Sequence, residues 1–271
     1  MNPTADDRRL ITVRGIDLSV DDAGSGPDLV WGHGLTGSVE ADDDRALFDW
    51  QRLRRTCRVV RYDARGHGQS ASSPVLDEYA WGSLAVDQLA LADALGIDRY
   101  VAAGASMGCA TALHAAVIAP QRIRALVLAI PPTAWQTRAA QAEMYLARAD
   151  LVEAGDHVTL LRQAALRPPP DPFVDDPTWG DRFERMLRTT DPVRLARVLR
   201  GAATADLPEP ETIARIEVPT LILAWTGDPG HPSTSAERLH ELIADSELAL
   251  ASTSTAVAGW TDRIERFLAQ L

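Results

Sequence analysis

The segment Gly104-Ala105-Ser106-Met107-Gly108 constrains the fold of this chain more than any other segment. It follows a short apolar run at 101–103, typical of a buried strand, and it leads into a helical run at 107–119 that ends at Pro120. A turn of this composition between a strand and a helix is typical of a nucleophile elbow, which exposes a serine hydroxyl above a sheet. We therefore expect a reactive Ser106, with the first N–H groups of the helix directed toward it.

Short apolar runs alternate with helical segments along most of the chain. Strands are predicted at 10–13, 16–20, 28–31, 59–62, 101–103, 125–130, 220–225 and 248–251, and helices at 45–53, 79–95, 107–119, 235–243 and 260–268. The first two strands flank Gly15 and predict an antiparallel hairpin. The alternation in the rest of the chain indicates βαβ units, and hence an α/β fold with a mostly parallel eight-stranded sheet and helices on both faces.

Residues 131–215 differ from the rest of the chain in pattern. Helical pieces there alternate with proline clusters, and strand-like alternation is absent. A segment of this length is too long for an ordinary connection. We therefore expect 1–130 and 216–271 to form one α/β core. The 131–215 segment is expected to form a helical cap, or lid, over the carboxyl ends of the strands, where open α/β sheets bind ligands.

The charged residues exclude several classes of function. All 27 basic residues are arginines, and 38 acidic residues bring the net charge to −11. Because lysine is absent, a Schiff-base or phosphate-loop lysine is excluded. The acidic balance argues against nucleic acid or an anionic membrane as a partner. Metal-ligand spacing and a complete dinucleotide fingerprint are both missing, so we expect neither a metal nor another cofactor.

Two segments bear on the location of the protein. Residues 1–10 are polar and charged and lack the apolar core of a signal peptide. The uncharged stretch 101–121 approaches the length of a membrane span, but Gly104 divides it, and a strand followed by a helix explains it better. We therefore expect a cytoplasmic protein without a membrane segment. The sequence does not indicate its oligomeric state.

A second loop complements the elbow. His33-Gly34-Leu35 follows the strand that we expect beside the elbow strand. An oxyanion hole needs two backbone N–H donors directed at the developing negative charge. We expect these donors to be Leu35 and Met107, the residue after the serine. His33 and Gly34 are placed in the wall of the substrate pocket, and His33 is interpreted chiefly as a residue that shapes the loop.

Together these motifs resemble the α/β-hydrolase family. The Gly32-His33-Gly34 loop, the Tyr62–Ser70 turn, the Gly104–Gly108 elbow and the Gly227-Asp228 turn occur in the order and spacing of that family, over essentially the whole chain. The resemblance implies a catalytic acid after the strand at 220–225, where Asp228 stands. It also implies a histidine between the last strand and the last helix. Here that segment, 252–259, is short and contains no histidine, and none follows His240.

His231 is the best remaining candidate for the catalytic base. A serine hydroxyl needs a base to take its proton, and the base needs an acid to orient it. His231 follows Asp228 by three residues, in the loop before the helix predicted at 235–243, so the loop can bring the two side chains into contact. Two alternatives stay open. The Asp-x-x-His-Pro segment can be turn chemistry that starts a helix, and His33 or His67 can supply the base.

The leading hypothesis is a cofactor-free serine hydrolase that cleaves a small carboxylic ester or lactone. Ser106 attacks the carbonyl, His231 or another base moves the proton, and Asp228 orients the base. Aromatic residues of the lid predict a small, apolar, uncharged substrate, with Trp135 as a wall and Trp225 near the same cleft. The alternatives are a non-hydrolytic lyase, cyclase or oxygenase on the same scaffold, and a pseudoenzyme that binds a small apolar ligand.

Overall fold

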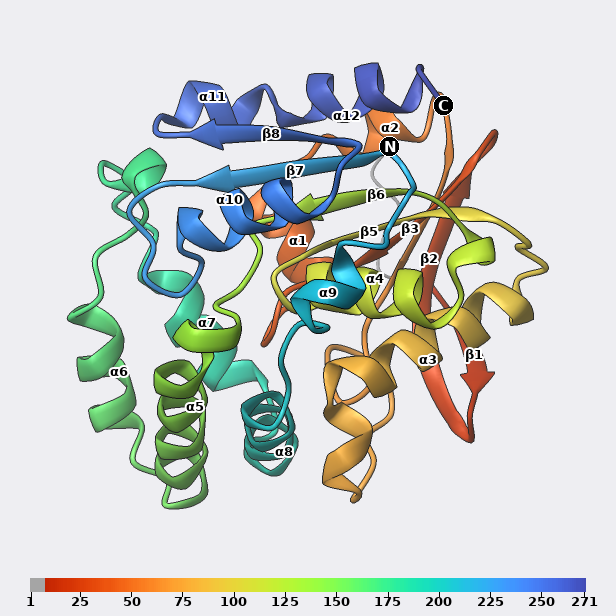
Figure 1. The fold of residues 1–271 in the computed structure, drawn as a ribbon. Helices are drawn as coiled ribbons and strands as arrows, with labels where there is room; N and C mark the ends of the chain where they lie inside the picture. Colours follow the sequence, from red (N-terminus) through yellow and green to blue (C-terminus); the bar gives the residue numbers. More distant parts are fainter. Residues whose placement is uncertain (1–7) are drawn as a thin grey trace.

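The computed structural model describes residues 8–271, and Figure 1 shows their arrangement. The strands are β1 (Arg9–Val13), β2 (Ile16–Gly24), β3 (Asp28–Gly32), β4 (Arg58–Tyr62), β5 (Tyr100–Ala105), β6 (Ile123–Ala129), β7 (Thr220–Trp225) and β8 (Ser246–Ala251). Within the described residues they form one eight-stranded sheet in the order β1-β2-β4-β3-β5-β6-β7-β8. β2 pairs antiparallel with β1 and β4, and the remaining pairs are parallel. The predicted mostly parallel sheet is confirmed.

Helices cover both faces of this sheet (Figure 1). One face carries α3 (Trp81–Ala94), α4 (Met107–Ile118), α9 (Pro210–Ile213) and α10 (Ser233–Leu242), and the other carries α2 (Trp50–Leu53), α11 (Ser254–Ala258) and α12 (Trp260–Leu268). Each set buries apolar side chains against its own side of the strands, because successive residues of a strand point to opposite faces. No helix within residues 8–271 is both long and apolar enough to cross a bilayer.

A further group of helices forms a separate hydrophobic cluster. It consists of α5 (Arg138–Glu153), α6 (His157–Ala165), α7 (Asp181–Thr189) and α8 (Pro192–Ala203). Figure 1 places these helices together, on the side of the sheet to which the arrowheads of β7 and β8 point. Parts of the 131–215 segment also pack on the sheet, since Phe173 and Trp179 contact the core beneath α12. The boundaries of the lid stay a prediction.

The helix predicted at 45–53 differs from the structure, which contains two short helices here. The first is α1 (Val39–Arg45), capped by the Ser38 hydroxyl, which accepts a hydrogen bond from the Ala41 N–H at 3.0 Å. It ends because Ala46 adopts a left-handed conformation with φ of 50°. Asp49 then caps α2, accepting from the Arg52 N–H at 2.9 Å. Local capping therefore outweighs the apolar spacing.

The order of the strands brings the two predicted loops together. β5 lies between β3 and β6, and Gly32 at the end of β3 is paired with Gly104 near the end of β5. The chain therefore leaves β3 and β5 side by side, at the place where the strand order reverses and open α/β sheets bind ligands.

Two glycines let α4 start directly on the backbone of these strands. A Cβ atom at Gly108 would lie 1.9 Å from the carbonyl oxygen of Gly32. One at Gly104 would lie 2.4 Å from the carbonyl carbon of Gly108. Both distances are far shorter than a van der Waals contact. The atoms concerned belong to the main chain, which cannot move aside as a flexible side chain can. The elbow therefore needs glycine at both positions for packing.

We predict that Gly108→Ala destabilises the protein, because its methyl group forces α4 away from β3. The expected loss is about 1–3 kcal/mol in the free energy of unfolding, as for other overpacked sites. Urea denaturation followed by circular dichroism measures it. Gly180→Ala is the matched control, because a Cβ there meets no atom within 4 Å and φ is −69°. Equal stability of the two variants would show that the close contact is unimportant.

Candidate active site

Ser106 lies at the tip of the elbow in a strained conformation. Its φ of 54° and ψ of −108° are unfavourable for a residue with a Cβ atom. The Ser106 N–H donates to the carbonyl oxygen of Ala129 at 3.0 Å, which ties the turn to the end of β6. The close backbone contacts of Gly104 with Gly108 and of Gly108 with Gly32 hold the turn from the other side. The surrounding packing therefore fixes the hydroxyl in one position.

His231 and Asp228 come from a single loop after β7. His231 Nε2 lies 2.8 Å from Ser106 Oγ, and His231 Nδ1 lies 2.7 Å from Asp228 Oδ2. A turn between the two residues, in which the His231 N–H donates to the Asp228 carbonyl oxygen at 3.1 Å, makes the approach possible. The structure thus brings the three predicted residues into one hydrogen-bonded chain, within the distances that proton transfer requires.

The environment of Asp228 keeps its carboxylate ionised. Burial opposes the charge, but the adjacent His231 side chain and two further donors outweigh it and hold the pKa of Asp228 well below its usual range. The donors are the Gly230 N–H, 2.8 Å from Oδ1, and the Trp225 indole N–H, 3.0 Å from Oδ2. The ionised Asp228 accepts a hydrogen bond from the Nδ1–H of His231. Nε2 is then free to accept the proton of the serine.

The loop after β3 lies against the nucleophile. A Cβ atom at Gly34 would lie 3.6 Å from the Ser106 Cβ atom. The Gly34 carbonyl oxygen accepts from the Gly37 N–H at 2.9 Å, which closes the loop. Within residues 8–271, neither the Leu35 N–H nor the Met107 N–H donates a hydrogen bond to another residue. Both predicted oxyanion donors are therefore available to a bound group.

His33 and His67 are engaged elsewhere. His33 Nδ1 donates to the Gly34 carbonyl oxygen at 2.7 Å, and its Nε2 accepts from the Ala64 N–H at 2.9 Å. His67 is buried behind it, and its Nδ1 donates to the Arg65 carbonyl oxygen at 3.0 Å. Burial and the neighbouring His33 lower the pKa of His67 to about 3. The geometry gives neither histidine the part of base to Ser106.

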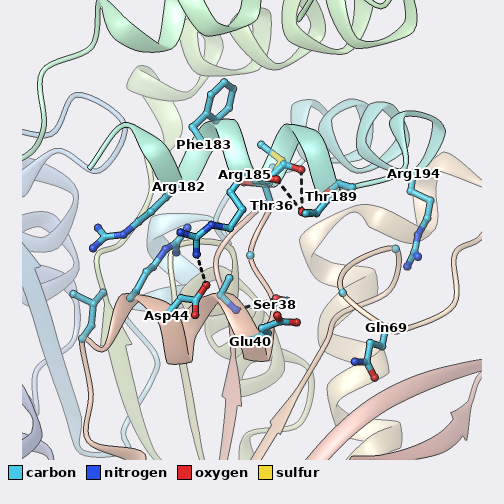
Figure 2. Close-up of a pocket in the computed structure, with 18 of the residues that line it drawn as sticks. Thr36, Ser38, Glu40, Asp44, Gln69, Arg182, Phe183, Arg185, Thr189 and Arg194 are labelled. Atoms are coloured by element: carbon cyan, nitrogen blue, oxygen red, sulfur yellow. Dashed lines mark hydrogen bonds and ion pairs between the residues drawn. The ribbon is translucent and has the colours of Figure 1, made fainter. Parts of the chain in front are cut away.

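Two cavities meet at this site. The inner cavity, of about 160 Å³, is lined by Ser106, Leu35, Tyr145 and other residues of the helical cluster. The outer cavity, of about 480 Å³, opens between α1 and α7 and is shown in Figure 2. The two cavities share four lining residues, which are Thr36, Phe183, Met186 and His231.

Of the four residues predicted to line the substrate pocket, Trp225 lines the outer cavity. His33 and Gly34, in the loop after β3, line neither cavity. Trp135 also lies outside both, because its backbone N–H donates to Asp206 and its indole N–H donates to the Pro208 carbonyl oxygen at 3.1 Å. These bonds turn its ring toward the core, against which it packs.

The walls of both cavities also carry arginines that no sequence motif indicated. Arg148 of α5 lines the inner cavity, and Arg182 and Arg185 of α7 line the outer one. Figure 2 shows Arg185 reaching across the outer cavity to Asp44 of α1, at 2.7 Å. A signal was present for Arg148, which shares one helix face with Tyr145 three residues before it and Val152 four residues after it. Within residues 8–271, no cluster of three or more His, Cys, Asp or Glu side chains is arranged to hold a metal ion.

Comparisons with known proteins identify the fold family of the chain. A family model described as alpha/beta hydrolase fold matches residues 29–254. The chain is 31% identical to 3-oxoadipate enol-lactonase 1 of Acinetobacter baylyi over 192 residues, which cover 70% of this chain and 69% of the relative. The crystal structure of the enol-lactonase from Burkholderia xenovorans LB400 has a TM-score of 0.81 at 24% identity, covering 96% of this chain and 100% of that one. That of a hydrolase from Pseudomonas aeruginosa PA01 has a TM-score of 0.79 at 27% identity, covering 98% and 99%.

We predict that His67 makes the folded protein sensitive to acid. Its pKa is about 3 when folded, against 6.5 for an ordinary histidine, so the unfolded chain binds more protons between these values. The contribution of His67 to the free energy of unfolding is complete above about pH 6.5. It is lost as the pH falls toward 3, by at most ~1.4 kcal/mol per pH unit. His67→Gln removes this sensitivity.

Urea unfolding at about pH 7.5 and pH 4.5 measures the effect. Wild type should lose at least about 1 kcal/mol more than His67→Gln between the two pH values. His157→Gln, an exchange at an exposed histidine, is the matched control and should behave as wild type. Equal losses in wild type and His67→Gln would contradict the prediction.

Proposed function

The chain belongs to the alpha/beta hydrolase fold family, and on this basis we propose that it is a serine hydrolase of small carboxylic esters or lactones. The observation that carries the proposal is the hydrogen-bonded chain from Ser106 Oγ through His231 to Asp228, with distances of 2.8 and 2.7 Å. Two relatives described as enol-lactonases support ester or lactone chemistry. The reaction uses side chains and backbone N–H groups alone.

The first half of the reaction forms an acyl-enzyme. Ser106 Oγ attacks the carbonyl carbon while its proton moves to His231 Nε2. The carbonyl oxygen becomes an oxyanion, which accepts hydrogen bonds from the Leu35 and Met107 N–H groups. The intermediate collapses, the bond to the leaving oxygen breaks, and His231 gives that oxygen its proton. The ionised Asp228 stabilises the imidazolium that exists between the two proton transfers.

The second half returns the enzyme to its starting state. Water attacks the acyl carbon and gives a proton to His231 Nε2. The second tetrahedral intermediate collapses, the bond to Ser106 Oγ breaks, and the serine takes its proton back. The products are a carboxylic acid and the alcohol, which stay joined in one hydroxy acid when the substrate is a lactone. We propose that α5, α6, α7 and α8 act as a lid that shields these steps from bulk water.

The acid and the base share one loop in this proposal. β8 ends at Ala251 and α11 begins at Ser254, and the connection contains no histidine. His231, three residues after Asp228, takes the role that the family resemblance assigns to a residue after the last strand. The hydrogen bonds of Asp228 to Gly230 and Trp225 support this arrangement, because they fix the loop that carries both residues.

We predict that a fluorophosphonate probe labels the wild type once, at Ser106. Intact-mass spectrometry should show no labelling of Ser106→Ala, because the nucleophile is gone. Labelling of His231→Ala should slow by about 10²-fold or more, because the serine keeps its proton. His157→Ala, an exchange at an exposed histidine, should label like wild type.

The other outcomes decide between the hypotheses. Labelling at the wild-type rate in His231→Ala would remove His231 from the mechanism. A wild type that resists the probe would refute the hydrolase proposal and favour a lyase or a ligand-binding protein on this scaffold.

We predict that Asp228→Asn lowers kcat by roughly 10³–10⁴-fold with little change in KM, since the amide no longer holds the productive tautomer or stabilises the imidazolium. Hydrolysis of 4-nitrophenyl butyrate measures it. Asp171→Asn is the matched control. Asp171 accepts from the Thr226 hydroxyl at 2.6 Å and lies in the same region without touching His231. A loss of the same size in Asp171→Asn would point to distortion of the loop instead.

A further inference from the structure

One arginine that lines the inner cavity, Arg148, has no anionic partner within residues 8–271. Arg148 lines this cavity together with Ser106 and is half-buried on α5. Its guanidinium carbon lies 5.5 Å from the centre of the Phe183 ring, so it stacks on an aromatic face. A stacked guanidinium keeps the N–H groups on its edge free to donate. Within residues 8–271, Arg148 forms no ion pair and no hydrogen bond.

Neighbouring arginines show how this chain otherwise satisfies such groups. Arg138, also on α5, donates from Nε to the Ala205 carbonyl oxygen at 2.6 Å and from Nη2 to that of Ala202. Arg200 of α8 pairs with Asp150 at 2.7 Å and with Glu153 at 2.6 Å. A charge withdrawn from water is costly unless a partner compensates it. Arg148 therefore differs from its neighbours in having a free donor edge that faces a cavity.

A second arginine adds to the positive charge. Arg167 lines the same cavity from the segment after α6, and its guanidinium contacts the Met144 sulfur. Burial and the nearby Arg167 lower the pKa of Arg148 to about 10, so Arg148 is still cationic at neutral pH. Two like charges at one cavity repel each other unless an anion lies between them. The one carboxylate among the described residues that line this cavity is Asp228, which is already bonded to His231, Gly230 and Trp225.

The arginines of α7 that line the outer cavity have carboxylate partners within residues 8–271. Arg185 pairs with Asp44 at 2.7 Å, and Arg182 with Asp176 at 3.4 Å. Figure 2 shows that Arg185 and Asp44 point toward one another. His231 lines both cavities and Ser106 only the inner one, so the scissile bond lies at their junction and the acyl group enters the inner cavity.

We infer that the inner cavity binds an acyl group that ends in a carboxylate, and that Arg148 is the residue that selects it. The substrate is then a monoester of a short dicarboxylic acid, or a lactone of a short hydroxy dicarboxylic acid. The planar guanidinium donates two parallel hydrogen bonds to the free carboxylate, and Arg167 adds charge at the edge of the cavity. The inference rests on the proposed function for the identity of the acyl group. It replaces the uncharged substrate expected from the aromatic residues of the lid.

The test compares esters that differ only in charge. The substrates are the monoethyl esters of succinate, glutarate and adipate, each matched with the ethyl ester of the corresponding monoamide. For the best chain length, wild-type kcat/KM should be about 10- to 100-fold higher for the acid than for the amide, as expected for one charge-assisted contact. Arg148→Gln should abolish this preference and change kcat/KM of the amide less than about threefold. Arg162→Gln, an exchange at an exposed arginine of α6 outside both cavities, should keep the preference.

Two results would overturn the inference. One is an equal kcat/KM within all three pairs in the wild type. The other is an Arg148→Gln variant that slows both members of a pair equally, which indicates a structural role. Arg148→Lys, which keeps the charge without the planar fork, should retain part of the preference. The comparison within the wild type needs no variant, so it decides the matter even if Arg148→Gln does not fold.

A binding measurement separates this inference from the proposed function. Calorimetric titration of Ser106→Ala with the preferred monoethyl ester needs no turnover, and the double variant with Arg148→Gln should bind it about tenfold or more weakly. Charge-selective binding in a protein that resists the fluorophosphonate probe would refute the hydrolase and retain the carboxylate site. Probe labelling without charge-selective binding would retain the hydrolase and refute the carboxylate site.

Discussion

The direct contact between the start of α4 and the backbone of β3 is the constraint on which the site depends. Gly108 lies so close to Gly32 that no side chain fits between them, and the same holds for Gly104 and Gly108. This contact forces the chain to turn sharply at Ser106 and accounts for its positive φ of 54°. It also sets Gly34 beside the serine. The nucleophile and the two expected oxyanion donors are thus positioned by one packing arrangement.

The loop after β7 completes the site with few residues. Asp228 is held by the Gly230 N–H and the Trp225 indole, and it orients His231 toward the serine. Trp225 also packs beside Trp260, with ring centres 5.8 Å apart, so the acid is connected to the core beneath α12. A loop that carries both the catalytic acid and the catalytic base needs a rigid support of this kind, because a small shift of the loop would break both hydrogen bonds.

Arginine supplies all the positive side-chain charge in this lysine-free chain, and the partner of each arginine indicates its role. Arg138 binds main-chain carbonyl groups and joins α5 to the end of α8. Arg185 joins α7 to α1 through Asp44. Arg148 has its aromatic neighbour but no acceptor within residues 8–271. The proposed carboxylate of the substrate would therefore give Arg148 the kind of partner that Asp44 gives Arg185.

The sheet, the elbow and the turn that carries Asp228 could be predicted from the sequence, because apolar periodicity, glycine spacing and chain order are local properties. His231 could be predicted as a candidate too, since three residues separate it from the acid. The folded arrangement was needed to show that His231 reaches Ser106, 125 residues away, and that His33 bonds to main-chain groups. The position of Trp135 and the exposure of the Arg148 edge to the cavity were decided there too. These depend on contacts between segments far apart in the chain, which no local pattern encodes.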